Sequence, residues 1–156
     1  MYKRQDTQEL GYILKPGETK APEYLINALK EGNRVQDIFT NNFVVGVSGN
    51  EILKKSLEEG RDEGLRPSIY THPLGTYGHS AGTTIGMWDS QGGVPFTGDY
   101  PLQYNTAYAI ELYTSVYIEE WKKDIRIMLE EAGFFGVDGH KYVNGRQKNI
   151  KIINPR

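Results

Sequence analysis

Two of the three histidines lie seven residues apart in the Gly- and Pro-rich stretch "YTHPLGTYGHSAG". His72 precedes Pro73, which predicts a stiff, extended backbone at the histidine. His79 has a glycine on either side within three residues, and glycine permits a close approach by a substrate backbone. Neutral imidazole is a common ligand of divalent metals, although a single histidine is more often a hydrogen-bonded structural residue than a ligand. The third histidine, His140, stands beside a turn in "DGHKY" and is expected to be exposed and without a function.

Carboxylates on two apolar segments could complete a metal site with these histidines. Glu111 interrupts "NTAYAIELYTSVYI", and on a strand it would share one face with Ala109 and Tyr113. An ionised carboxylate there must be paired, bound to a metal or turned to solvent, because burying it alone costs several kcal/mol. Arg126 is one possible partner.

The next apolar segment, "KDIRIMLEEAGFFGV", offers a second carboxylate. On a period of two, Glu130 shares its face with Arg126 and Met128, while Ile127 and Leu129 lie on the other face. A bulge would exchange the faces and present Glu131 instead, and the pair could also be solvated at a strand end.

Composition restricts the chemistry to these residue types. The chain has 156 residues, 38% hydrophobic and 24% charged, which suits one domain with a modest core. It has no cysteine, so a metal must bind Asp, Glu and His. A net charge of −2 without a long Lys/Arg cluster argues against nucleic acid, and no apolar run is long enough to cross a membrane.

The first half of the chain predicts one strand and two helices. Polar and apolar residues alternate at the start of residues 7–18, and a Pro-Gly pair follows, which predicts a strand running into a turn. Apolar residues then recur at helical spacing from residue 21 to 43, with Pro22 in the first turn and Gly32 as a point of bending or interruption. Ser48 and Glu51 form a capping-box pattern that begins a second helix, which is expected to end near Gly64.

The second half predicts strands and loops. Residues 105–118 and 123–137 are the clearest strands, and residues 140–153 look like a final hairpin with Asn-Gly at its turn. The aromatic segment 87–104 could line a substrate pocket or pack on the surface, with equal weight.

The order of these features resembles the pita-bread metallopeptidases, the family of methionine aminopeptidase, Xaa-Pro aminopeptidase, prolidase and creatinase. In that family a metal-ligand histidine is followed seven residues later by a histidine that contacts the substrate carbonyl, which implies these roles for His72 and His79. Glu111 matches the first glutamate ligand. Glu130 matches the second, because Gly139 follows it by nine residues, although Arg126 precedes it by four residues rather than the usual two. Asp6, followed by a hydroxyl residue and a strand, matches the second aspartate ligand.

The resemblance implies an α+β chain in which two N-terminal-half helices pack on a curved antiparallel sheet, a partial pita-bread fold. The family's first aspartate should lie about a dozen residues before Asp6, so residues 1–156 are expected to be a single, N-terminally truncated domain. A complete site would hold up to two divalent ions (Mn, Co, Zn or Fe) bridged by Asp6 and Glu130, with His72 and Glu111 completing one ion's ligands. This chain is expected to hold one ion or none.

The implied activity is hydrolysis of the N-terminal residue from peptides, of the Xaa-Pro aminopeptidase type, by water that the metals activate, with low activity in this chain. Ser68 weighs against a preference for proline, because proline-specific relatives often carry a histidine there. A peptide is the expected partner, and a homodimer could cover apolar surface left by the missing part. The alternative is a non-catalytic binding or scaffold module of the same fold.

Overall fold

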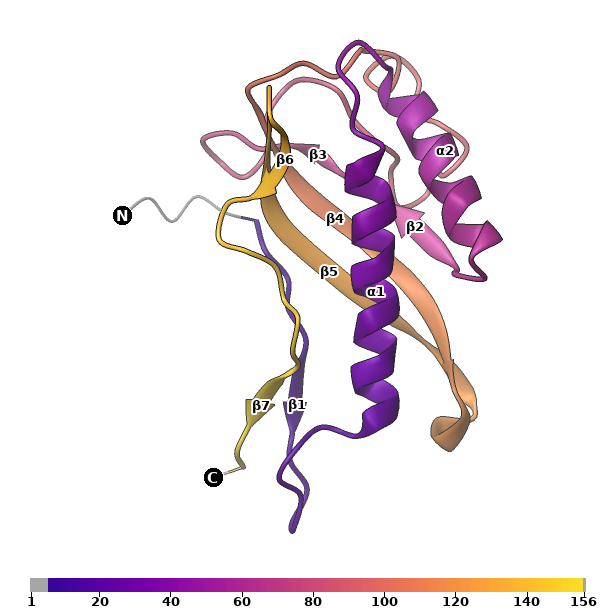
Figure 1. Cartoon of the computed structure of the whole chain (residues 1–156), viewed down its shortest axis with the longest axis vertical. Coiled ribbons are helices and arrows are strands. Elements are labelled where there is room, and N and C mark those ends of the chain that lie inside the picture. The colour runs from indigo at the N-terminus through magenta and orange to yellow at the C-terminus, as the bar shows by residue number, and fades with distance from the viewer. Residues whose placement is uncertain (1–5, 156) are drawn as a thin grey trace.

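The computed structural model describes residues 6–155 and consists of two α-helices, one 3-10 helix and seven strands (Figure 1). The elements in chain order are β1 (Gly11–Ile13), α1 (Glu23–Asn41), α2 (Gly49–Asp62), β2 (Pro67–Ile69), β3 (His72–Pro73), β4 (Thr106–Ile118), η1 (Glu119–Trp121), β5 (Lys123–Gly136), β6 (Gly139–Tyr142) and β7 (Lys151–Ile153).

The main sheet is antiparallel, with strand order β2-β4-β5-β6, and β3 pairs with β4 beyond β2. The two longest strands, β4 and β5, form a hairpin closed by η1. Both α-helices pack on the same face of this sheet (Figure 1). The expected α+β arrangement of two helices on an antiparallel sheet is therefore confirmed.

The helices begin where the sequence predicts, but the glycine in α1 has a different role. Ser48 caps α2 in a capping box with Glu51, so the backbone N–H groups of the first turn are satisfied. Pro22 directly precedes α1 rather than lying within its first turn. The predicted bend at Gly32 is wrong, because α1 runs through it without interruption. Gly32 is buried against β5, where a Cβ atom would lie 2.9 Å from side-chain carbons of Ile127 and Leu129.

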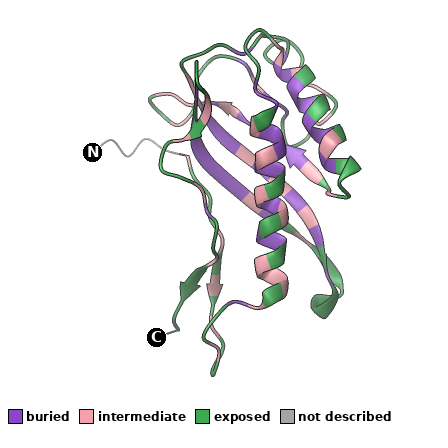
Figure 2. Cartoon of the chain, viewed as in Figure 1, coloured by how far each residue is buried: buried purple, intermediate pink, exposed green. Residues whose placement is uncertain are grey.

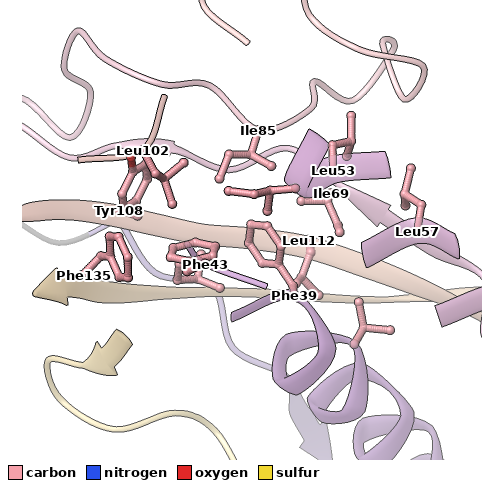
Figure 3. Close-up of a cluster of buried hydrophobic side chains, with 13 residues drawn as sticks. Phe39, Phe43, Leu53, Leu57, Ile69, Ile85, Leu102, Tyr108, Leu112 and Phe135 are labelled. Carbon is pink, nitrogen blue, oxygen red and sulfur yellow. The ribbon is translucent and has the colours of Figure 1, made fainter. Parts of the chain in front are cut away.

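The core lies between the helices and the sheet, and Figure 2 shows the buried residues concentrated there. Alternation along β4 puts Tyr108, Ile110 and Leu112 on this face, as the sequence predicts. They pack with Phe39 of α1 and Leu53 of α2 in the larger cluster (Figure 3). The face of the sheet that carries Glu111 and Glu130 is consequently the one that the helices leave open.

The predicted C-terminal hairpin is wrong. β6 pairs with β5, whereas β7 pairs in parallel with β1 in a separate two-stranded sheet. Gly145 does adopt a left-handed conformation, with φ of 79°, but long-range contacts direct the chain beyond it. Arg146 Nη1 donates to Asp37 Oδ1 at 2.6 Å, and the side chain of Gln147 both accepts from Leu10 N and donates to Leu10 O at 2.7 Å. These contacts outweigh the local preference for a hairpin. No described helix is both long and apolar enough to span a membrane.

Candidate metal centre

Two glutamates face each other across the β4–β5 ladder. Glu111 and Glu130 are register partners, so their side chains project from the same open face of the sheet. Glu130 is 6% exposed and Glu111 is partly buried. Arg126 does not neutralise Glu111, since its guanidinium lies over the ring of Tyr113 with Cζ 4.9 Å from the centroid. The structure thus places two acidic groups side by side, and no arginine within residues 6–155 forms an ion pair with either of them.

Glu131 belongs to the other face of β5. The ladder is regular through this point, with Ile110 opposite Glu131, so no bulge exchanges the faces. The carboxylate of Glu131 accepts a hydrogen bond from the backbone N–H of Gln147 at 2.7 Å. Of the two adjacent glutamates, Glu130 is therefore the one that lies beside Glu111.

His72 reaches the glutamate pair from β3. Its strand pairs with β4 at Ala109, two residues before Glu111. Thr71 reinforces the junction, because its hydroxyl donates to Glu111 O at 3.1 Å and accepts from Glu111 N at 3.0 Å. The ring nitrogen Nε2 of His72 lies 3.8 Å from Glu111 Oε2. The other nitrogen, Nδ1, lies 3.1 Å from Pro73 O, and donation to this carbonyl leaves the Nε2 lone pair facing the glutamates.

His79 and Asp6 adjoin His72 from the loop and from the N-terminal segment. The loop folds back through a hydrogen bond from Ser80 N to Pro73 O at 2.9 Å, and the ring of His79 stacks on that of His72 at 3.9 Å with an angle of 8°. Asp6 Oδ2 lies 3.7 Å from His79 Nε2. Asp6 is positioned by Gln8, which exchanges two backbone hydrogen bonds with Glu130 at 2.9 and 3.1 Å.

All five predicted site residues thus meet on the open face. They form two groups that share one residue, and within each group the potential ligand atoms lie within 4.8 Å of one another. The two groups are His72 with Glu111 and Glu130, and His72 with Asp6 and His79.

His140 is not part of this cluster, and the prediction that it is exposed is wrong. Its ring packs edge-on against Phe43 at 5.6 Å and against Tyr142 at 4.6 Å. The Nε2 atom is buried without a hydrogen-bond partner among the described residues. Burial lowers the pKa of His140 to about 4, so the residue is a neutral core histidine. Its position on β6 opposite Phe135, which the sequence misassigned to a hairpin, accounts for the difference.

The electrostatics of the cluster suit a cation. Burial, the charge of Glu111 and the charge of Asp6 raise the pKa of Glu130 to about 8. Burial and the charge of Asp6 raise the pKa of Glu111 to about 7. Burial also lowers the pKa of His72, which favours the neutral imidazole that metals require. Carboxylates that repel one another beside a neutral imidazole are a donor set for a divalent metal, so these His and Glu groups could hold one.

A cleft of about 500 Å³ opens beside the cluster on the same face of the sheet. Met87 and Trp88 line it, so the start of the aromatic segment borders the site. The remainder divides between the core, where Leu102 is buried, and the surface, where Phe96 is 80% exposed. Residues 87–104 thus divide among the cleft, the core and the surface, and a substrate-lining role for Met87 and Trp88 stays a prediction.

Tyr70 also lines this cleft, although it is not among the site residues predicted from the sequence. Burial and the charges of Glu111 and Glu130 raise the pKa of Tyr70 to about 12. Its hydroxyl is buried and has no hydrogen-bond partner among the described residues. The spacing could have identified Tyr70, because it precedes His72 by two residues and an extended chain puts both side chains on one face.

Comparisons with solved structures identify the fold. The chain superposes on an X-Pro aminopeptidase from Thermotoga maritima with a TM-score of 0.64 and 20% identity, covering 95% of this chain and 37% of that one. A Xaa-Pro dipeptidase from Bacillus anthracis superposes with a TM-score of 0.62 and 16% identity, covering 96% of this chain and 37% of the dipeptidase. A methionine aminopeptidase from T. maritima superposes with a TM-score of 0.53 and 15% identity, covering 78% of this chain and 52% of the aminopeptidase.

The chain therefore has the fold of part of the pita-bread peptidases. It spans about a third of the length of the X-Pro aminopeptidase and of the Xaa-Pro dipeptidase. No protein-family model matches the sequence, and a search of curated proteins finds no similar one. The likeness at these identities concerns the fold, while the cluster of His72, Glu111 and Glu130 is a property of this chain.

Proposed function

We propose that this chain binds a divalent metal and that the site serves hydrolysis of the N-terminal residue from short peptides. His72, Glu111 and Glu130 would hold the metal, with Asp6 beside them. The observation that carries the proposal is the cross-strand pair of glutamates with raised pKa values, facing the Nε2 atom of His72 in a fold shared with metallopeptidases. Without a cation, the glutamate pair avoids repulsion only when a carboxyl group holds a proton.

A divalent metal bound here would supply Lewis acidity, which polarises a peptide carbonyl and makes water more acidic. The protein's own contribution is orientation and proton holding. The Pro73 carbonyl orients the His72 ring, and the Glu130 carboxyl holds its proton at neutral pH until a cation takes its place. His79 lines the cleft beside His72, where its ring can donate a hydrogen bond to the carbonyl of a bound peptide. Asp6 Oδ2 lies 3.7 Å from Nε2 of that ring.

Metal binding is tested by calorimetry with Mn²⁺, Co²⁺ and Zn²⁺, each added separately to the metal-free chain. We expect His72→Ala to weaken binding by roughly 100-fold or more, since the variant lacks the only imidazole shared by both ligand groups. Glu120→Gln, at an exposed position on η1, is the control that removes a carboxylate elsewhere. Binding that is equally tight in wild type and His72→Ala would refute the site.

Hydrolysis is tested separately, by incubating the metal-loaded chain with short peptides and detecting the released N-terminal amino acid. Release that depends on metal and on His72 is the expected result. His72-dependent metal binding without any release would instead support the non-catalytic module.

A further inference from the structure

The cleft beside the acidic cluster is also lined by a positive charge, that of the exposed Arg126. Arg126 precedes Glu130 by four residues on β5 and lines the same cleft. Its guanidinium leans over the ring of Tyr113, whose register partner Met128 lies between Arg126 and Glu130. The side chain thus extends along the strand toward the acidic cluster.

Arg126 differs from the arginines that stabilise the fold. Arg34, Arg66 and Arg146 each form an ion pair, with Glu63, Asp124 and Asp37 respectively. Arg126 forms no ion pair with any carboxylate in residues 6–155. A guanidinium that is held over an aromatic ring at a cleft, with its donors unpaired, is suited to an external carboxylate.

We propose that Arg126 binds a carboxylate of the peptide substrate, two residues beyond the bond that is cleaved. This inference rests on the proposed function, which places the substrate's N-terminal residue at His72, Glu111 and Glu130. The charges are complementary to a short peptide, because the acidic end of the cleft attracts the amino group and Arg126 attracts the carboxylate.

Strand geometry sets the length of this peptide. Four residues along β5 separate Arg126 from Glu130 by about 13 Å between Cα atoms, and the lean toward Tyr113 shortens the distance between the head groups to roughly 7–13 Å. An extended peptide advances by about 3.3–3.6 Å per residue. A tripeptide, whose terminal carboxylate lies about 7 Å beyond its first carbonyl, spans this distance once the ligand contacts at both ends are added. Tyr113, Met128 and Trp88 then face the side chains of the second and third residues.

The test is direct binding to the full chain, measured by calorimetry or by NMR titration at low ionic strength, so that it does not depend on catalysis. The ligands are Ala-Leu-Ala with a free carboxylate, the same peptide amidated, and an amidated peptide with Asp as its third residue. We expect the free acid to bind roughly 3- to 10-fold more tightly than its amide. Arg126→Gln should abolish this ratio. Lys123→Gln, which removes the same charge from an exposed site on β5 outside the cleft, should preserve it.

The inference is overturned if neither the free terminus nor the Asp side chain tightens binding to wild type, or if the tightening persists in Arg126→Gln. Tightening by the Asp side chain alone that is lost in Arg126→Gln would support a carboxylate at Arg126 and assign it to a side chain rather than to the terminus. His72→Ala separates this inference from the proposed function, because the acid-to-amide ratio should survive that substitution even if metal binding and hydrolysis are lost. Melting curves of each variant confirm that the comparisons are made on folded protein.

Discussion

Replacing Glu130 by glutamine should stabilise the metal-free protein while removing a metal ligand. Glu130 is buried beside Glu111 and Asp6, and its pKa is raised from 4.5 to about 8. A group whose pKa is higher in the folded state adds most stability below its unfolded pKa, and this contribution is lost as the pH rises toward the folded value. At pH 7 the unfolded chain has released the proton while the folded chain retains it. The corresponding cost to folding is about 3 kcal/mol, at about 1.4 kcal/mol per pH unit above 4.5.

Glutamine keeps the shape of the protonated side chain and does not ionise. Glu130→Gln should therefore raise the unfolding free energy by up to about 3 kcal/mol at pH 7 and by less than about 1 kcal/mol at pH 5. For a chain of this size, 3 kcal/mol corresponds to a rise in Tm of about 6–12 °C. The assay is thermal and urea unfolding in EDTA between pH 4.5 and 8, followed by circular dichroism.

Metal should largely cancel the difference between the two proteins at pH 7. A cation at 100 times its Kd adds about 2.7 kcal/mol to the wild type, and the variant should gain much less because it lacks one ligand. Glu120→Gln serves as the control and should change stability by less than about 0.5 kcal/mol at every pH. A lower unfolding free energy of Glu130→Gln at pH 7, or an effect of the same size at pH 5 and pH 7, would contradict this prediction.

Three further substitutions test how the fold supports the site, each by urea unfolding at pH 7. Gly32→Ala should cost about 1–3 kcal/mol, because the added Cβ lies 2.9 Å from two β5 side chains, and a neutral result would mean that α1 can move away from the sheet. Ser48→Ala should cost about 1 kcal/mol through loss of the capping box, and an unchanged midpoint would contradict that role of the hydroxyl. Gln147→Ala should cost about 1–3 kcal/mol, because it leaves the N–H of Leu10 without its partner and removes one of the two hydrogen bonds to the C=O of Leu10. The same substitution should speed hydrogen exchange at the Leu10 amide. Exchange as slow as in wild type would show that other contacts hold the segments around Leu10 and Gln147 together.

Much of the fold can be predicted from local patterns. Alternation along residues 105–118 and 123–137 identifies the two central strands and their faces, because side chains on a strand repeat every two residues. Helical periodicity and a capping box locate both helices. The C-terminal hairpin failed as a prediction because Arg146 and Gln147 find partners more than 100 residues away, which no local pattern reveals.

Residue types and their spacing are enough to name the candidates for the site: a histidine pair in a rigid loop, one glutamate on each of two successive strands, and an early aspartate. How these residues combine depends on packing between distant parts of the chain. The β4–β5 register puts Glu130 rather than Glu131 opposite Glu111, and the bonds between Gln8 and Glu130 bring Asp6 to His79. The physical reason is that strand register depends on the whole ladder, and a shift of one residue would turn each carboxylate to the other face. The burial that raises the pKa values of Glu111 and Glu130 arises from the same packing.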